Sequence, residues 1–236
     1  MTIRGNPEAR IWLFDFDNTL AALETEVDWA GSRRRLETFL RGEGIDDAVF
    51  DEFPSRNLPL YNALLSRLLH DSQHGANLMR QASEIIESYE LQGVKNASPL
   101  PGAIELLLEL RSRGKRIAIV TSNSSRTVTR WLVLHGLVPV VGAIIGRDSM
   151  LALKPSPEMV IRALALSDGS GSDAVFVGDS EADLHAANRA QVAFFGVSPD
   201  LDARNRLVSL GACDVFLSPR GLARHLRLFQ SSAKPG

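Results

Sequence analysis

Two aspartates close to the N-terminus have a spacing that can support chemistry. Asp15 and Asp17 end residues 11–17, a short apolar run whose aromatic and branched content is typical of a buried strand. In an open α/β fold these acids would lie at the carboxyl edge of the sheet, where ligands usually bind. They share a face only if the chain stays extended. Two carboxylates there can act as nucleophile and proton shuttle, or together hold a hard cation.

A second acidic pair follows another apolar run. Residues 174–177 predict a strand, and Gly178, Asp179 and Asp183 come after it at the start of a helical stretch. Taken alone, Asp179 could simply cap that helix. Carboxylates that converge from two strand ends would repel one another unless a divalent cation neutralised them, and Mg²⁺ prefers carboxylates together with a substrate phosphate.

Two further segments offer hydrogen-bond donors and positive charge. Thr121, Ser122 and Asn123 follow a predicted strand and precede a helix, so hydroxyls and free backbone N–H groups there could bind an anion. Ordinary helix capping by Ser or Thr would give the same pattern. Lys154 precedes two prolines that stiffen its loop, and could direct a point charge to the same edge or simply face solvent.

Strands alternate with helices along most of the chain, which predicts an α/β fold whose parallel sheet is covered on both faces. The predicted strands are residues 11–17, 116–121, 140–145, 174–177, 192–195 and 214–217. The predicted helices are residues 101–112, 124–135, 157–166, 181–190, 201–210 and 219–229.

The segment 22–97 breaks this alternation. It has helical patterns at residues 60–69 and 78–89 and no convincing strand. Residues 96–102 contain two prolines and a glycine, which is typical of a linker. We therefore expect an α/β core domain over residues 1–21 and 98–236 and an α-helical cap domain over residues 22–97.

Composition and charge narrow the class of protein. Of 236 residues, 44% are hydrophobic and 23% charged, which is typical of a folded globular chain. Lys and Arg number 26 against 28 Asp and Glu, a net charge of −2 that indicates neither a nucleic-acid nor a membrane partner. The single Cys213 excludes an internal disulfide. Residues 1–10 do not resemble a secretory signal, and no apolar run reaches the roughly 18 residues of a membrane span, so we expect a cytoplasmic protein.

The order of these motifs resembles the haloacid dehalogenase superfamily, whose pattern is Asp-x-Asp-x-Thr, then Thr or Ser, then Lys, then Gly-Asp-x-x-x-Asp. The matching residues here are Asp15, Asp17, Thr19, Thr121, Lys154, Gly178, Asp179 and Asp183. The resemblance implies a Rossmann-like parallel sheet and an inserted α-helical cap like that of the phosphoglycolate phosphatase-like subgroup. Asn18 and Gln191 depart from the pattern at positions where relatives often have glycine.

By this resemblance the chain is expected to be a Mg²⁺-dependent phosphatase with an aspartyl-phosphate intermediate. Asp15 would attack phosphorus, and Asp17 would protonate the leaving oxygen and then deprotonate water, with Lys154 as the third catalytic residue. The residues expected to bind the substrate phosphate are Thr121, Ser122, Asn123 and Lys154. The expected metal ligands are Asp15, Asp17 through its backbone carbonyl, Asp179, and Asp183 directly or through water.

Three other functions stay open: a 2-haloacid dehalogenase, a phosphosugar mutase on the same core, and a non-catalytic binding module. Asp17 argues against the dehalogenase, because that reaction needs no acid for the leaving group. The partner is expected to be a small phosphorylated metabolite, phosphoglycolate-like, a sugar phosphate or a nucleotide, and the chain a monomer or homodimer. Candidate specificity residues in the cap, where helix arginines more often face solvent, are Arg33, Arg34, Arg35, Arg56 and Tyr61.

Overall fold

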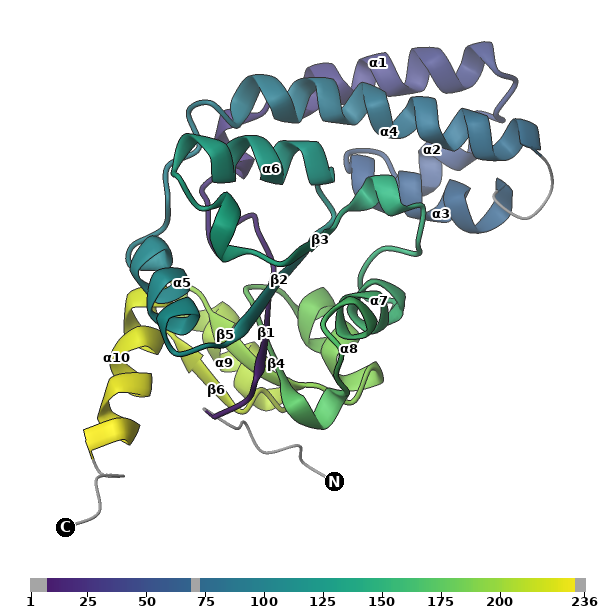
Figure 1. Cartoon of the computed structure of the whole chain (residues 1–236). Helices are drawn as coiled ribbons and strands as arrows, with labels where there is room; N and C mark the ends of the chain where they lie inside the picture. The colour runs from purple at the N-terminus through teal and green to yellow at the C-terminus, as the bar shows by residue number, and fades with distance from the viewer. Residues whose placement is uncertain (1–7, 69–72, 232–236) are drawn as a thin grey trace.

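A six-stranded parallel sheet forms the centre of the computed structural model, which describes residues 8–68 and 73–231 (Figure 1). The strand order is β3-β2-β1-β4-β5-β6, and each neighbouring pair is parallel. The strands are β1 (Ile11–Phe14), β2 (Arg116–Val120), β3 (Ala143–Ile145), β4 (Ala174–Gly178), β5 (Ala193–Val197) and β6 (Asp214–Phe216). The predicted α/β fold with a parallel sheet is confirmed.

Helices cover both faces of the sheet because successive residues of a strand point to opposite faces. Trp12 and Phe14 of β1 pack in one buried cluster, and Ile11 and Leu13 pack in another. The first cluster includes residues of α5 (Ala103–Ser112), α6 (Ser125–Leu134) and α10 (Pro219–Ser231). The second includes residues of α7 (Glu158–Leu166), α8 (Glu181–Arg189) and α9 (Leu201–Ser209).

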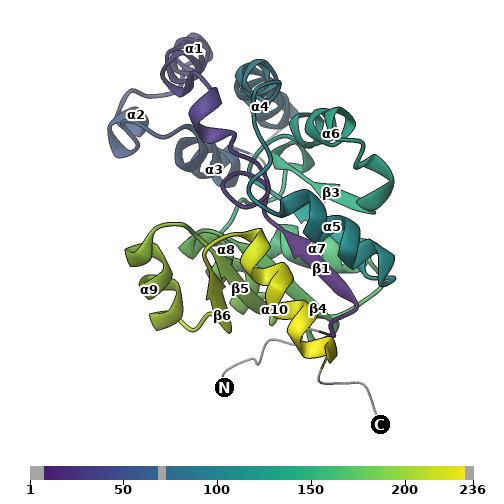
Figure 2. The same ribbon diagram turned by 90° about the vertical axis from the view of Figure 1, so that its left-hand side faces the viewer.

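Four α-helices lie between β1 and α5 in the sequence and stand over the carboxyl edge of the sheet, at the top of Figures 1 and 2. They are α1 (Trp29–Gly42), α2 (Ala48–Glu52), α3 (Asn57–Leu68) and α4 (Gln73–Gly93). The helix α4 packs against α1 and α3 on one side and against α6 on the other. The described part of the insertion contains no strand, and its limits as a separate domain stay a prediction.

The two chain segments that join this insertion to the sheet run side by side. Ala22 N donates to Ser98 O at 2.9 Å, and Leu100 N donates to Leu20 O at 2.9 Å. These backbone hydrogen bonds hold the start and the end of the insertion next to each other.

Several predicted boundaries need correction. The first strand ends at Phe14 rather than residue 17, because the chain leaves the sheet there and turns at residues 18–20. The run 140–145 is not one strand, since a 3₁₀-helix containing Pro139 extends to Val140 and only Ala143–Ile145 pair with β2. The predicted strand 192–195 lies at Ala193–Val197. The predicted helix 78–89 spans Gln73–Gly93.

Some predictions fall on residues outside the described part. These are residues 1–7 of the N-terminal segment, which does not resemble a secretory signal, and the last residue of the predicted helix 60–69. Within residues 8–68 and 73–231, no helix is long and apolar enough to cross a membrane.

The two departures from the family pattern both have left-handed backbone. Asn18 has φ 56° and Gln191 has φ 58°. Glycine adopts this conformation without steric cost, and Asn is among the other residues that tolerate it best. The backbone at these positions therefore keeps the geometry that glycine would favour.

Candidate active site

Three carboxylates meet at the carboxyl edge of the sheet. Asp15 follows β1, Asp179 follows β4, and Asp183 lies in the first turn of α8. Asp15 N donates to Val177 O at 2.9 Å, so the ladder between β1 and β4 continues to the first acid. One oxygen of each carboxylate lies within 4.8 Å of the other two. The structure thus brings together acids that are far apart in the sequence.

Local sequence fixes the position of Asp183. Ser180 caps α8, with its Oγ accepting from Asp183 N at 3.2 Å and its backbone N donating to Asp183 Oδ2 at 3.1 Å. Gly178 leaves room for this side chain, since a Cβ at residue 178 would lie 2.7 Å from Asp183 Cγ. The alternative that Asp179 caps this helix is therefore wrong, and Asp179 is available to face the site.

Thr19 and Lys154 contact these acids. Thr19 is fully buried, and its Oγ1 donates to Asp179 Oδ1 at 3.4 Å. Lys154 Nζ lies 2.5 Å from Asp15 Oδ1 and 2.5 Å from Asp183 Oδ1, and its side chain is only 6% exposed. The alternative of a solvent-facing lysine is therefore wrong.

The electrostatics of the cluster favour an additional positive charge. Burial raises the pKa of Asp15 to about 7, although Lys154 lowers it. Burial and the neighbouring Asp183 and Asp15 carboxylates raise the pKa of Asp179 to about 9. For Lys154, burial lowers the ammonium pKa but the two carboxylates outweigh this, so its pKa lies above the ordinary value. One ammonium does not balance three carboxylates, and the hard oxygen donors suit a divalent cation.

Asp17 faces the chain that leads into the insertion. Its Oδ1 accepts from Leu23 N and from Glu24 N, each at 2.9 Å. Burial raises the pKa of Asp17 to about 6, with these backbone hydrogen bonds acting in the opposite direction. The carboxylate of Asp17 is not part of the three-carboxylate cluster, and coordination through its backbone carbonyl stays a prediction.

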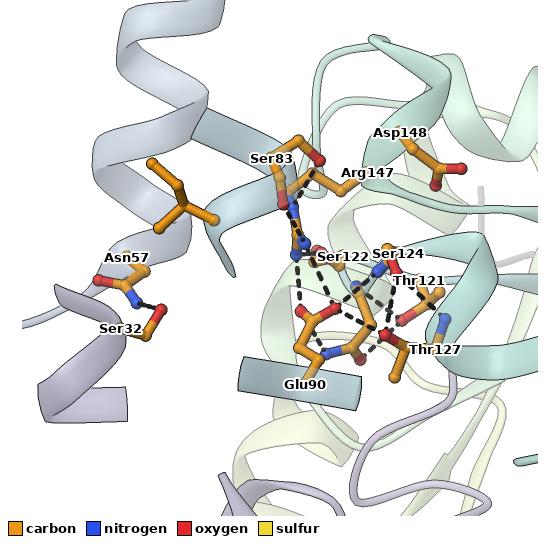
Figure 3. Close-up of polar contacts among 12 residues, drawn as sticks. Ser32, Asn57, Ser83, Glu90, Thr121, Ser122, Ser124, Thr127, Arg147 and Asp148 are labelled. Atoms are coloured by element: carbon orange, nitrogen blue, oxygen red, sulfur yellow. Dashed lines mark hydrogen bonds and ion pairs between the residues drawn. The ribbon is translucent and has the colours of Figure 1, made fainter. Parts of the chain in front are cut away.

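Residues 121–124, between β2 and α6, form a loop that we call the 121–124 loop (Figure 3). Thr121 Oγ1 donates to Asn123 Oδ1 and accepts from Asn123 N, both at 3.1 Å. Helix capping falls to Ser124, whose Oγ accepts from Thr127 N at 3.1 Å. Asn123 Nδ2 donates to Glu90 Oε1 at 3.1 Å, so the side-chain amide of Asn123 joins the loop to α4. Ser122 is half-buried.

Sequence reasoning missed two residues beside this loop, Glu90 and Arg147. Both side chains are fully buried and pair at 2.7 Å. Arg147 follows the third strand and so lies at the same sheet edge, which was a usable signal. Glu90 continues the helical spacing of the buried residues Met79, Ser83 and Ile86. An acid on the buried face of a helix indicates a specific partner.

The cap candidates divide into buried and exposed residues. Arg33 is buried and donates to Glu37 Oε1 at 2.5 Å and to Arg56 O at 3.1 Å, so the expectation that it faces solvent is wrong. Tyr61 is also buried, and its hydroxyl donates to Met150 Sδ at 3.4 Å. The exposed candidates are Arg34, Arg35 and Arg56.

A comparison with known protein families identifies the class of protein to which this fold and this cluster of acids belong. The family model described as haloacid dehalogenase-like hydrolase matches residues 12–197, and the chain belongs to this family. The predicted superfamily and the prediction that the chain is an enzyme are both confirmed.

Relatives within this family are phosphatases. A phosphoglycolate phosphatase of Caulobacter vibrioides is 29% identical over 185 residues, which cover 76% of this chain and 75% of that protein. A phosphoglycolate phosphatase of Aquifex aeolicus is 27% identical over 182 residues, covering 77% and 81%. The predicted phosphoglycolate phosphatase-like subgroup is confirmed.

Solved structures confirm the fold. CbbY from Rhodobacter sphaeroides in complex with phosphate is 24% identical, with a TM-score of 0.60 over 91% of this chain and 96% of that one. A haloacid dehalogenase-like hydrolase from Bacteroides fragilis is 21% identical, with a TM-score of 0.64 over 89% and 97%.

Proposed function

We propose that this chain is a Mg²⁺-dependent phosphatase that hydrolyses a small phosphomonoester through an aspartyl-phosphate on Asp15. The observation that carries the proposal is the cluster of Asp15, Asp179 and Asp183, with oxygens within 4.8 Å of one another and Lys154 against two of them. This arrangement puts a nucleophilic oxygen, a cation site and a fixed positive charge at one point of the sheet edge.

The chain's own residues account for both halves of the reaction. An oxygen of Asp15 attacks phosphorus, the bond to the leaving oxygen breaks, and Asp17 donates its proton to that oxygen. Asp17, now ionised, removes a proton from water, whose oxygen attacks the aspartyl-phosphate and releases Asp15 and inorganic phosphate. The raised pKa of Asp17, about 6, keeps a useful fraction of both protonation states near neutral pH.

The oxygen donors fit Mg²⁺, with Asp15, Asp179 and Asp183 as side-chain ligands and the backbone carbonyl of Asp17 as a further one. When bound, the cation supplies charge neutralisation at the phosphate oxygens. Lys154 holds Asp15 in place and neutralises charge on the transferring phosphoryl group. Thr121, Ser122 and Asn123 would bind the phosphate oxygens, and Ser122 is the most exposed of the three.

The substrate class follows from the core and the relatives. The phosphoglycolate phosphatases that this chain resembles act, by their name, on a small phosphate ester, and this core would contact mainly the phosphate group. We infer a small phosphorylated metabolite, phosphoglycolate-like, a sugar phosphate or a nucleotide. The helices α1–α4 would contact the leaving group and set the choice among these esters.

The test is phosphate release from a panel of small phosphomonoesters with and without Mg²⁺. Asp15→Asn and Asp17→Asn are compared with wild type, and Asp202→Asn, an exposed carboxylate on α9, is the matched control. We expect metal-dependent turnover in wild type and the control, and a loss of several orders of magnitude in kcat for both site variants.

The alternatives give different results in the same assay. Full activity in Asp15→Asn would exclude the covalent route. Release of chloride from chloroacetate without metal would favour a dehalogenase, and isomerisation of a sugar phosphate without phosphate release would favour a mutase. If wild type turns over nothing, a non-catalytic binding module replaces the proposal.

A further inference from the structure

A buried ion pair joins the helical insertion to the core beside the 121–124 loop (Figure 3). Arg147, in the turn after β3, places Nη1 2.7 Å from Oε1 of Glu90, which lies near the end of α4. Both side chains are fully buried. Removing two charges from water is costly, and such a pair persists only where further hydrogen bonds satisfy the remaining atoms.

The carboxylate of Glu90 meets that condition through the loop. Its Oε1 accepts from Asn123 Nδ2 at 3.1 Å. Its Oε2 accepts from Ser124 N at 3.0 Å and from Thr127 Oγ1 at 3.1 Å. A residue of the insertion therefore fixes the backbone and a side chain of the loop that follows β2.

The guanidinium of Arg147 reaches both sides of the junction. On the core side, Nη1 donates to Ser122 O at 2.9 Å. On the insertion side, Nε donates to Ser83 Oγ at 3.1 Å and Nη2 donates to Ser83 O at 3.2 Å. Ser83 and Glu90 are two turns apart on α4, so Arg147 holds that helix along its length.

The network ends at a residue of the proposed phosphate site. Asn123, which donates to Glu90, also accepts from Thr121 Oγ1 at 3.1 Å. A change in the position of α4 would reach the Thr121 hydroxyl through two hydrogen bonds. Because Glu90 neutralises the charge of Arg147, the pair adds little net electrostatic potential at the site. Its effect is to fix the positions of the loop atoms.

We propose that Glu90 and Arg147 are positioning residues that hold the 121–124 loop in its phosphate-binding conformation only while α4 lies against the core. The proposal rests on the proposed function, since it takes this loop as the phosphate site. It adds that phosphate binding and the packing of α4 on the core are thermodynamically coupled, so that each favours the other.

The test measures two ligands separately by isothermal titration calorimetry: Mg²⁺ alone, and inorganic phosphate at saturating Mg²⁺. Removal of one partner leaves an uncompensated buried charge, so the main variant is the double change Glu90→Gln with Arg147→Met. We expect its phosphate affinity to fall at least tenfold and its Mg²⁺ affinity to stay within twofold. A purely structural role would weaken both ligands together or neither.

A matched control removes a neighbouring ion pair that does not touch the loop. Arg126 Nη1 of α6 pairs with Glu87 Oε1 of α4 at 2.7 Å, one turn before Glu90, and the Arg126 side chain is 74% exposed. The double change Glu87→Gln with Arg126→Met should leave phosphate affinity within twofold. Arg147→Lys retains the charge but not the several hydrogen bonds, so it should bind phosphate more weakly than wild type.

A measurement on wild type covers the case in which the double variant does not fold. Hydrogen–deuterium exchange with saturating Mg²⁺ should show slower exchange in residues 83–93 when phosphate is added, because the coupling is reciprocal. Unchanged exchange there, or unchanged phosphate affinity in a folded double variant, overturns the positioning role. Failure of wild type to bind phosphate or hydrolyse any ester overturns the proposed function as well, so the two failures are distinguishable.

Discussion

Replacement of Asp179 by Asn should stabilise the protein in the absence of divalent cations. The carboxylate of Asp179 lies within 4.8 Å of those of Asp15 and Asp183, and Lys154 offsets only part of the repulsion. At 4.8 Å and an effective dielectric constant near 20, each like-charge pair costs about 3.5 kcal/mol. Two repulsions against one attraction leave about one pair uncompensated, so this repulsion alone should give the variant about 3 kcal/mol when Asp179 is ionised in wild type. Burial of the charge, which Asn avoids, adds to that gain.

The sign of the pH dependence follows from the pKa shift. Burial and the two carboxylates raise the pKa of Asp179 from 3.8 to about 9, so between these values the folded wild type holds a proton that the unfolded chain has lost. Wild-type stability therefore falls as pH rises through this window, whereas Asn at this position does not titrate. The advantage of Asp179→Asn should be near zero below about pH 4 and complete above about pH 9.

Thermal denaturation in EDTA between pH 5 and pH 9 measures this difference. A gain of about 3 kcal/mol corresponds to a rise in Tm of roughly 6–12 °C for a chain of this size. Asp202→Asn, on the exposed face of α9, controls for the loss of one negative charge. Saturating Mg²⁺ should reverse the order, since the variant lacks a proposed ligand. An equal Tm for Asp179→Asn and wild type at pH 9 in EDTA would refute the electrostatic reasoning.

Three other substitutions test the packing around the site. Gly178→Ala should weaken Mg²⁺ binding measured by calorimetry, because the new Cβ would lie 2.7 Å from Asp183 Cγ and displace that carboxylate. Ser180→Ala removes the cap of α8 and should lower the free energy of unfolding in urea by about 1 kcal/mol. Phe16→Ala should lower the free energy of unfolding by about 3–5 kcal/mol, because Phe16 is fully buried and packs edge-on against Trp131, with the ring centroids 5.4 Å apart. An unfolding free energy within 0.5 kcal/mol of wild type, a value typical of surface changes, would contradict either stability estimate.

Asp15 and Asp179 could be located from the sequence because each directly follows an apolar strand run. Parallel strands deliver their carboxyl ends to one edge of the sheet, so Asp15 and Asp179 had to meet once the strands were recognised. The contact of Lys154 with Asp15 and Asp183 could be foreseen only as one of two alternatives. Its loop conformation is set by tertiary packing and not by local propensity.

The buried charges outside the motifs could not be assigned from the sequence. Arg33 and Arg147 are both buried although arginine usually faces solvent. Arg33 donates to Glu37 of its own helix and to Arg56 O, and Arg147 donates to Glu90 of α4 and to Ser122 O. Composition and periodicity do not identify such partners when they lie 57 residues apart, as Glu90 and Arg147 do. The pattern locates the buried face of α4, and only the fold supplies the arginine beside it.

Both ends of the helical insertion contact residues of the proposed active site. At the entry, the carboxylate of Asp17 accepts from the backbone of Leu23 and Glu24. At the exit, Glu90 and Arg147 join α4 to the loop proposed to bind phosphate. A rotation of α1–α4 about the paired linkers would therefore alter the proton donor and the phosphate site together. An insertion that contacts only the leaving group would set specificity alone, whereas by the proposed coupling this one would also control the geometry of the proton donor and of the phosphate site.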